Sequence, residues 1–297
     1  MCYVQASEYF CMNNPHRAGL TLLEMAIVLV IVGLLAGGLM GGRYMVQQAE
    51  LQSVVADFTK YKTAVSQFNT KYGGLPGDIR DATDYWGVDT RTSDATSPCN
   101  SVLRAEDRKP KKGTCNGDGD RKIGQTTAAG VVSAAWPEIF RAWQQLSNAG
   151  LIAGIFSGVA GTASVSHVSH VVFDDVAQNA PSGKRGKTGY TLYWLGPRDL
   201  DAAHFDGTDY RHVILYGTST TSTLASDAAL TPREAKTLDG KIDDGKPGLG
   251  RVYARVDATC VRDSAATSIL GLYAQSTVAF YDTSLTKIGC AIGYKID

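Results

Sequence analysis

The chain has 297 residues, of which 44% are hydrophobic and 20% charged, an ordinary composition for a globular protein that is long enough to bury a sizeable core. Lysine plus arginine and aspartate plus glutamate both number 29, so no net charge favours nucleic acid or an anionic membrane surface as a partner. The overall charge therefore gives no indication of function, and no nucleic-acid partner is evident.

The first predicted element is an apolar helix near the N-terminus. No charged side chain occurs between Met25 and Gly42, and with Leu20–Leu23 the run approaches the roughly 20 residues that cross a bilayer as a helix. A secretory signal peptide has a shorter apolar region, of about 7 to 15 residues. A simple signal anchor explains the length but not Glu24, because an ionised carboxylate in a membrane helix costs about 3 kcal/mol and usually has a partner.

The residues around this carboxylate resemble a known signal. The segment "GLTLLE", residues 19–24, followed by a run rich in valine, isoleucine, leucine and glycine, is similar to the prepilin signal of type IV pilins and type II secretion pseudopilins. The resemblance implies a leader of residues 1–19, cleavage after Gly19 by a prepilin peptidase, N-methylation of Leu20 and a role in assembly for Glu24. Leu20 stands where the family usually has phenylalanine.

Elementary electrostatics agrees with this resemblance. Cleavage leaves an α-ammonium group on Leu20 among apolar helices, and Glu24 of a neighbouring subunit can neutralise it. Each charge then offsets the desolvation cost of the other. The same helix would serve first as a membrane anchor and later as the core of a polymer.

A second apolar pattern extends this helix. Side chains at alternating spacings of 3 and 4 residues form a stripe along one helical face: Leu51, Val54, Phe58, Tyr61, Val65, Phe68 and Tyr72. We predict one helix over residues 20–72, ended by Gly73, Gly74 and Pro76. Its stripe is expected to pack onto a globular head of residues 73–297, and a coiled-coil dimer is the alternative use of the same stripe.

The predicted head combines helices with strands late in the chain. A helix is expected over about residues 131–148, with Gly150 as its stop, and a shorter helix opens at Thr231 and Pro232. Strands are expected at about residues 169–173, 190–195, 212–216, 251–256, 276–281 and 287–293. This order of elements indicates an α+β fold with an antiparallel sheet.

The six cysteines do not form a metal or redox motif, because no two have CxxC spacing. Cys2 and Cys11 fall in the predicted leader, and an internal start at Met12 would remove them from the protein. The other four are Cys99, Cys115, Cys260 and Cys290. They can form two disulfides in an oxidising compartment, and short loop closure favours pairing in sequence order among the three possible connectivities.

The segment "NGDGDRKIG" is the main candidate metal site; Asp239, Asp243 and Asp244 could also bind a cation, but a structural turn is the favoured interpretation there. Asn116, Asp118 and Asp120 alternate as the oxygen ligands of a calcium loop do. Arg121 and Thr127 stand where an EF-hand has glycine and glutamate, so the site is incomplete and a solvated turn is the alternative. No cofactor is required, and calcium is the only one that the sequence suggests.

Other chemical motifs are weak. "PSGKRGKT", residues 181–188, lacks the first glycine of a phosphate-binding loop and is interpreted as an exposed basic turn. His167 and His170 lie in a segment that favours extended structure, so we interpret them as ordinary histidines. No GxSxG motif occurs, and nothing in the chain compels catalysis.

The leading interpretation is a non-enzymatic filament subunit, a type IV pilin or pilin-like protein. The resemblance implies an inner-membrane location before assembly and a periplasmic or extracellular filament afterwards. It also implies self-assembly, prepilin peptidase, an inner-membrane assembly platform and other pilins as partners. A minor pseudopilin of a type II secretion system, a membrane-anchored periplasmic binding module and an anchored enzyme are the alternatives.

Overall fold

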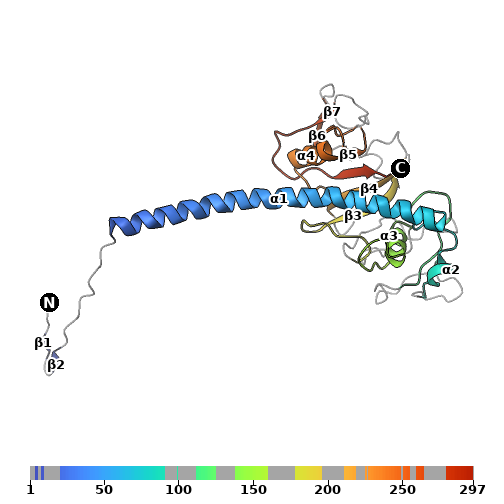
Figure 1. Ribbon diagram of the computed structural model, residues 1–297, viewed down its shortest axis with the longest axis horizontal. Helices are drawn as coiled ribbons and strands as arrows, with labels where there is room; N and C mark the ends of the chain where they lie inside the picture. The colour runs from blue at the N-terminus through green and yellow to red at the C-terminus, as the bar shows by residue number, and fades with distance from the viewer. Residues whose placement is uncertain are drawn as a thin grey trace. The chain divides into compact units, whose positions relative to one another are not determined.

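The long helix α1 (Leu22–Tyr72) is shared between two compact units of the chain, Met1–Ala49 and Glu50–Asp297 (Figure 1). A short hairpin of β1 (Val4–Gln5) and β2 (Glu8–Tyr9) precedes it. The computed structural model describes residues 4–5, 8–9, 21–90, 99, 112–124, 138–159, 178–195, 211–218, 225, 227–248, 250–254, 259–263 and 279–296.

The end of α1 follows from the glycines after Tyr72. Gly73 has a φ of +74°, a left-handed conformation that favours glycine, and its N–H donates to the carbonyl of Asn69 at 2.9 Å. The helix therefore ends at Tyr72, the predicted residue. It begins at Leu22, and the predicted first residue, Leu20, lies outside the described residues.

The predicted apolar stripe of α1 packs into the core of the second unit. Six of its seven side chains are at most 5% exposed: Leu51, Val54, Phe58, Tyr61, Val65 and Phe68. The Phe58 ring stacks on Tyr294 at 5.2 Å and meets Tyr190 edge-on at 5.9 Å. Tyr61 meets Trp143 at 5.0 Å. The stripe is thus occupied by the head, as predicted, and not by the coiled-coil alternative.

An antiparallel sheet forms the other side of this core. Its strand order is β3 (Thr188–Leu195), β4 (Arg211–Thr218), β8 (Ile292–Lys295) and β5 (Val252–Ala254). Every neighbouring pair is antiparallel, and Ile214 of β4 lies opposite both Leu192 and Tyr294. A separate antiparallel pair consists of β6 (Val261–Asp263) and β7 (Ala279–Tyr281). The α+β prediction with an antiparallel sheet is confirmed.

Among its described residues the second unit has three further helices: α2 (Ala82–Trp86), α3 (Glu138–Asn148) and α4 (Pro232–Ile242). The apolar face of α3 is fully buried through Ile139, Phe140, Trp143 and Leu146. Thr231 caps α4 with Glu234 in a capping box, with proline at its first turn. Residues 131–137 of the predicted helix lie outside the described residues.

One strand prediction was misplaced. We predicted a strand at 287–293, whereas β8 runs from Ile292 to Lys295. The Gly289 and Cys290 N–H groups both donate to the carbonyl of Leu230, at 3.0 and 2.9 Å, so this stretch is engaged before the sheet begins. β6 and α2 were not predicted, because Val261–Asp263 holds a single apolar residue and Ala82–Trp86 spans little more than one helical turn, so neither shows a period. The predicted strand at 169–173 lies outside the described residues.

Candidate functional site

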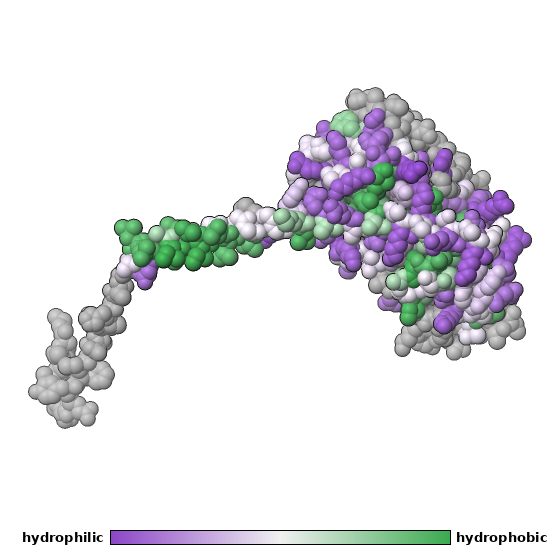
Figure 2. All heavy atoms as spheres, in the orientation of Figure 1, coloured by the Kyte–Doolittle hydropathy of each residue, from purple (hydrophilic) through white to green (hydrophobic). Residues whose placement is uncertain are grey.

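The first half of α1 leaves its apolar side chains uncovered. Leu22 is 90% exposed and Leu34 72%, and none of the most apolar window of the helix is buried within the chain. By length and composition α1 is the one helix among the described residues that can cross a membrane. Figure 2 shows the apolar residues of this half as a continuous hydrophobic surface. Such an area is large enough to require a bilayer or other chains as its cover.

Glycines make this surface suited to close packing between helices. In the glycine-rich part of α1, an added Cβ would meet no atom within 4 Å at Gly33, Gly37, Gly38, Gly41 and Gly42. Among the described residues, therefore, no close neighbour explains their small size. Small residues on an apolar helix allow a second helix to approach its backbone closely.

Glu24 is organised by a capping box at the start of α1. The backbone N–H and the hydroxyl of Thr21 both donate to Oε2 of Glu24, at 2.9 and 3.0 Å, and the Glu24 N–H donates to the Thr21 hydroxyl at 3.2 Å. The carboxylate also lies at the helix N-terminus, where the helix dipole favours a negative charge. Glu24 is exposed, so its carboxylate can form an ion pair with a cationic group from outside the chain. The Thr-x-x-Glu pattern was present in the sequence, but the sequence analysis did not use it.

The predicted processing residues directly precede this box in the sequence. Gly19 and Leu20 are outside the described residues, so their roles stay a prediction. The described chain resumes at Thr21, one residue beyond the predicted cleavage site.

The structure pairs the four head cysteines in sequence order. Cys99 and Cys115 are 16 residues apart, Cys260 and Cys290 are 30 apart, and each pair forms a disulfide. This is the connectivity that loop closure favours among the three possible. The second disulfide ties the residue before β6 to the turn that precedes β8.

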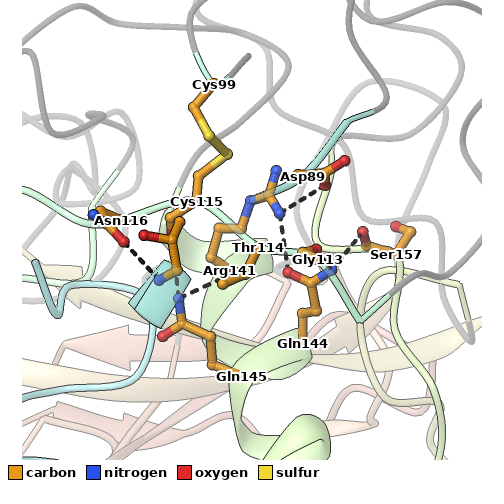
Figure 3. Close-up of a disulfide and its surroundings, with 11 residues drawn as sticks. Asp89, Cys99, Gly113, Thr114, Cys115, Asn116, Arg141, Gln144, Gln145 and Ser157 are labelled. Carbon is orange, nitrogen blue, oxygen red and sulfur yellow. Dashed lines mark hydrogen bonds and ion pairs between the residues drawn. A yellow bond between two sulfur atoms is a disulfide. The ribbon is translucent and has the colours of Figure 1, made fainter. Parts of the chain in front are cut away.

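A buried polar network holds Asp89 and residues 113–115, at the end of the first disulfide's loop, against α3 (Figure 3). Arg141 donates to Asp89 at 3.0 Å, and both side chains are at most 1% exposed. Gln144 donates to the carbonyl of Gly113 at 3.0 Å, and Gln145 donates to that of Cys115 at 3.3 Å. Because removal of either Arg141 or Asp89 would leave the other charge buried and unpaired, we expect the ion pair to hold Asp89 firmly against α3.

The predicted calcium ligands are only partly brought together. Asp118 and Asp120 lie within 4.8 Å of the buried Asp78, a residue that the sequence analysis did not consider. Asn116 serves elsewhere, because its Oδ1 accepts the Thr83 N–H at 2.8 Å. The loop is also held without an ion, since Asp78 accepts the N–H groups of Asp120 and Arg121 at 3.1 and 2.9 Å. Calcium therefore stays a prediction, tested by comparing thermal stability in calcium and in chelator.

Burial dominates the electrostatics of this loop. It raises the pKa of Asp78 to about 6, against the opposing effect of the backbone hydrogen bonds. Glu138, at the start of α3, accepts the N–H groups of Asp118 and Gly124 at 3.1 and 3.0 Å. Its burial raises the pKa to about 8. Both carboxyls bind the backbone of residues 117–124 and so act as structural anchors.

The turn interpreted as basic and exposed has a different role at its centre. Arg185 is 23% exposed and forms ion pairs with Glu50 of α1 and Glu234 of α4, at 3.1 and 2.7 Å. Thr188 is buried, and its hydroxyl donates to the Arg185 carbonyl at 2.6 Å. The exposed-turn interpretation holds for Lys184 and Lys187 but was wrong for Arg185, because its partners lie far away in sequence.

The histidines bring no described cluster together. His212 is 6% exposed in β4, and its Nε2 accepts the Ile123 N–H at 3.3 Å. His212 therefore has a structural role. His167 and His170 lie outside the described residues.

The comparison with protein families concerns the N-terminal segment. Residues 14–40 match the prokaryotic N-terminal methylation motif, which spans the predicted cleavage site, Glu24 and the uncovered apolar helix. No curated protein and no solved structure matches the chain. The motif is that of a structural family and, together with the apolar helix, indicates membrane anchoring, processing by prepilin peptidase and assembly with other pilins. The chain thus carries the N-terminal signal of type IV pilins and pseudopilins.

Proposed function

We propose that this chain is a structural subunit of a type IV pilus or pilin-like filament that polymerises through the first half of α1. The observation that carries the proposal is the methylation motif on a helix that buries none of its most apolar window within its own chain. Before assembly the bilayer covers this surface. In the filament the helices of other subunits replace the lipid.

The chemistry of assembly centres on two charges. Prepilin peptidase cuts after Gly19, and the new amino terminus at Leu20 is methylated. The resulting ammonium group pairs with Glu24 of a neighbouring subunit, which removes the cost of leaving either charge alone among apolar helices. In the isolated chain, Thr21 already satisfies Glu24, so the carboxylate is oriented before its cationic partner arrives.

The proposal also places the protein in the cell. The uncut chain is held in the inner membrane, with the head on the periplasmic side, where both disulfides can form and persist. An assembly platform in the inner membrane then moves the processed subunit into the filament. The chain itself performs no catalytic step.

Mass spectrometry of the protein from its own cell tests the processing step. We expect a mature chain that begins at Leu20 and carries one added methyl group. A chain that keeps residues 1–19, or one cut beyond the apolar run, would contradict the proposal. The protein should also copurify with sheared filaments. Copurification separates a filament subunit from an anchored binding module.

Three variants separate the charge of Glu24 from its capping role. Glu24→Gln keeps an acceptor for Thr21 but removes the charge, whereas Thr21→Ala removes the cap and keeps the charge. Glu24→Ala removes the charge and the side-chain acceptor of Thr21, while the backbone N–H of residue 24 can still donate to the Thr21 hydroxyl. We expect both Glu24 variants to insert into the membrane and fail to assemble, while Thr21→Ala assembles. Normal filaments from Glu24→Gln would rule out the charge-pairing mechanism.

A further inference from the structure

The point where α1 joins the head is held by an ionic contact as well as by apolar packing. The second compact unit begins at Glu50, and the next residue, Leu51, is the first buried member of the apolar stripe. Glu50 accepts from Nε of Arg185 at 3.1 Å, although 135 residues separate the two in sequence. This contact is at the outer end of the stripe.

The guanidinium of Arg185 is fixed from its other side. Its Nη1 and Nη2 donate to the two carboxylate oxygens of Glu234, at 3.0 and 2.7 Å, in a bidentate arrangement. Nη1 also donates to the carbonyl of Ala229 at 3.3 Å. Glu234 is in turn part of the capping box with Thr231, so its carboxylate cannot swing freely. Nε is thereby directed at Glu50.

Partial burial gives these ion pairs more weight than a surface pair has. The side chains of Arg185, Glu50 and Glu234 are 23%, 29% and 17% exposed. A planar guanidinium can bind two carboxylates at once in fixed directions, which a lysine ammonium cannot do. The arrangement is therefore specific for arginine.

The apolar stripe alone does not decide where the helix leaves the head. Its members recur every 3 or 4 residues, so its end can fray by one turn at a modest cost in buried area. About two turns further along, Asp57 accepts the Tyr190 hydroxyl at 3.0 Å, which holds the next part of the helix. Glu50 is the outermost of these polar contacts.

We propose that Arg185, with Glu50 and Glu234, is an ionic latch that sets the residue at which α1 is released from the head. While the latch is closed, the helix is committed to the head from Glu50 onward. When it opens, the turn from Glu50 to Val54 joins the uncovered part of the helix. Built on the proposed function, this inference separates the part of α1 free to pack with other subunits from the part that each subunit keeps.

Amide hydrogen exchange of the full-length protein in detergent micelles tests the latch. In Arg185→Gln we expect exchange in peptides covering Glu50–Asp57 to be about tenfold faster than in the wild type, with α3 and β4 unchanged. Arg185→Lys should recover only part of the protection. Lys184→Gln, an exposed neighbour in the same turn, is the matched control and should have no effect.

Unchanged exchange over Glu50–Asp57 in Arg185→Gln would overturn the latch, and so would an equal increase throughout the head. If Arg185→Gln does not fold, Glu50→Gln decides, because it leaves the Arg185–Glu234 pair intact and should give the same local increase. The measurement uses unassembled protein. Failure of filament formation would therefore count against the proposed function and not against the latch. Unchanged hydrogen exchange in Arg185→Gln would count against the latch and not against the proposed function.

Discussion

The two halves of α1 use apolar residues in opposite ways. From Leu22 to Val46 the described large apolar side chains are all at least 46% exposed, whereas from Leu51 to Phe68 those of the stripe are at most 5% exposed. The first half is apolar around its whole circumference, and the second is apolar on one face with polar residues on the others. The backbone of a helix can thus be continuous while its two halves rely on different partners to bury their apolar side chains.

The largest expected effect comes from a residue of the second half. Phe58 is 1% exposed and contacts two aromatic rings, so Phe58→Ala should lower the free energy of unfolding of the head by about 3–5 kcal/mol. Ile31→Ala, in the first half, is the matched control and should leave the head unaffected. Thermal unfolding of the full chain in detergent, followed by near-ultraviolet circular dichroism, measures both. Equal losses of stability in Phe58→Ala and Ile31→Ala would contradict the difference between the two halves of α1.

A second test removes a covalent restraint that only the head possesses among the described residues. The double substitution of Cys260 and Cys290 by alanine should cost the head about 3 kcal/mol, because the disulfide closes a loop with a sequence separation of 30. The helical signal of the micelle-embedded half should persist while the head melts at lower temperature. Loss of both signals together would mean that the two halves unfold as one body.

The head should also respond to pH through Glu138. Burial raises its folded-state pKa to about 8, so between about pH 4.5 and 8 the folded state holds a proton that the unfolded state has released. The contribution of Glu138 to the free energy of unfolding is therefore fully present below about pH 4.5 and is lost as the pH rises through about 8. In Glu138→Gln the melting temperature should fall less steeply over this interval. An unchanged slope would show that Glu138 does not titrate as stated.

The smallest expected effect compares the two capping boxes. Thr231→Ala should reduce the stability of the head by about 1 kcal/mol, because α4 loses its N-cap and Glu234 loses part of its support. Thr21→Ala removes the equivalent cap from the first half of α1 and should not change the melting temperature of the head. Thermal unfolding of both variants under the same conditions measures the difference. A lower melting temperature of the head in both variants would indicate that the two halves of α1 unfold together.

Several features could be predicted from the sequence because each depends on residues that are close together in the chain. The methylation motif, the stripe at 3 and 4 residue spacing and the cap at Thr231 depend on residues within a few turns of one another. β6, α2 and the position of β8 were not predicted, because β6 holds a single apolar residue, α2 spans little more than one helical turn, and the Leu230 carbonyl accepts from the backbone at Gly289 and Cys290.

By itself the sequence determined that the chain carries the N-terminal methylation motif on an apolar helix and continues into an α+β head, since hydrophobic period and local motifs are properties of neighbouring residues. Only the tertiary structure decided that Asp78 joins Asp118 and Asp120, that Asn116 does not, and that Arg185 binds Glu50. These contacts join residues far apart in sequence. Their partners are chosen by packing of the sheet, α1 and α4, which no local pattern specifies.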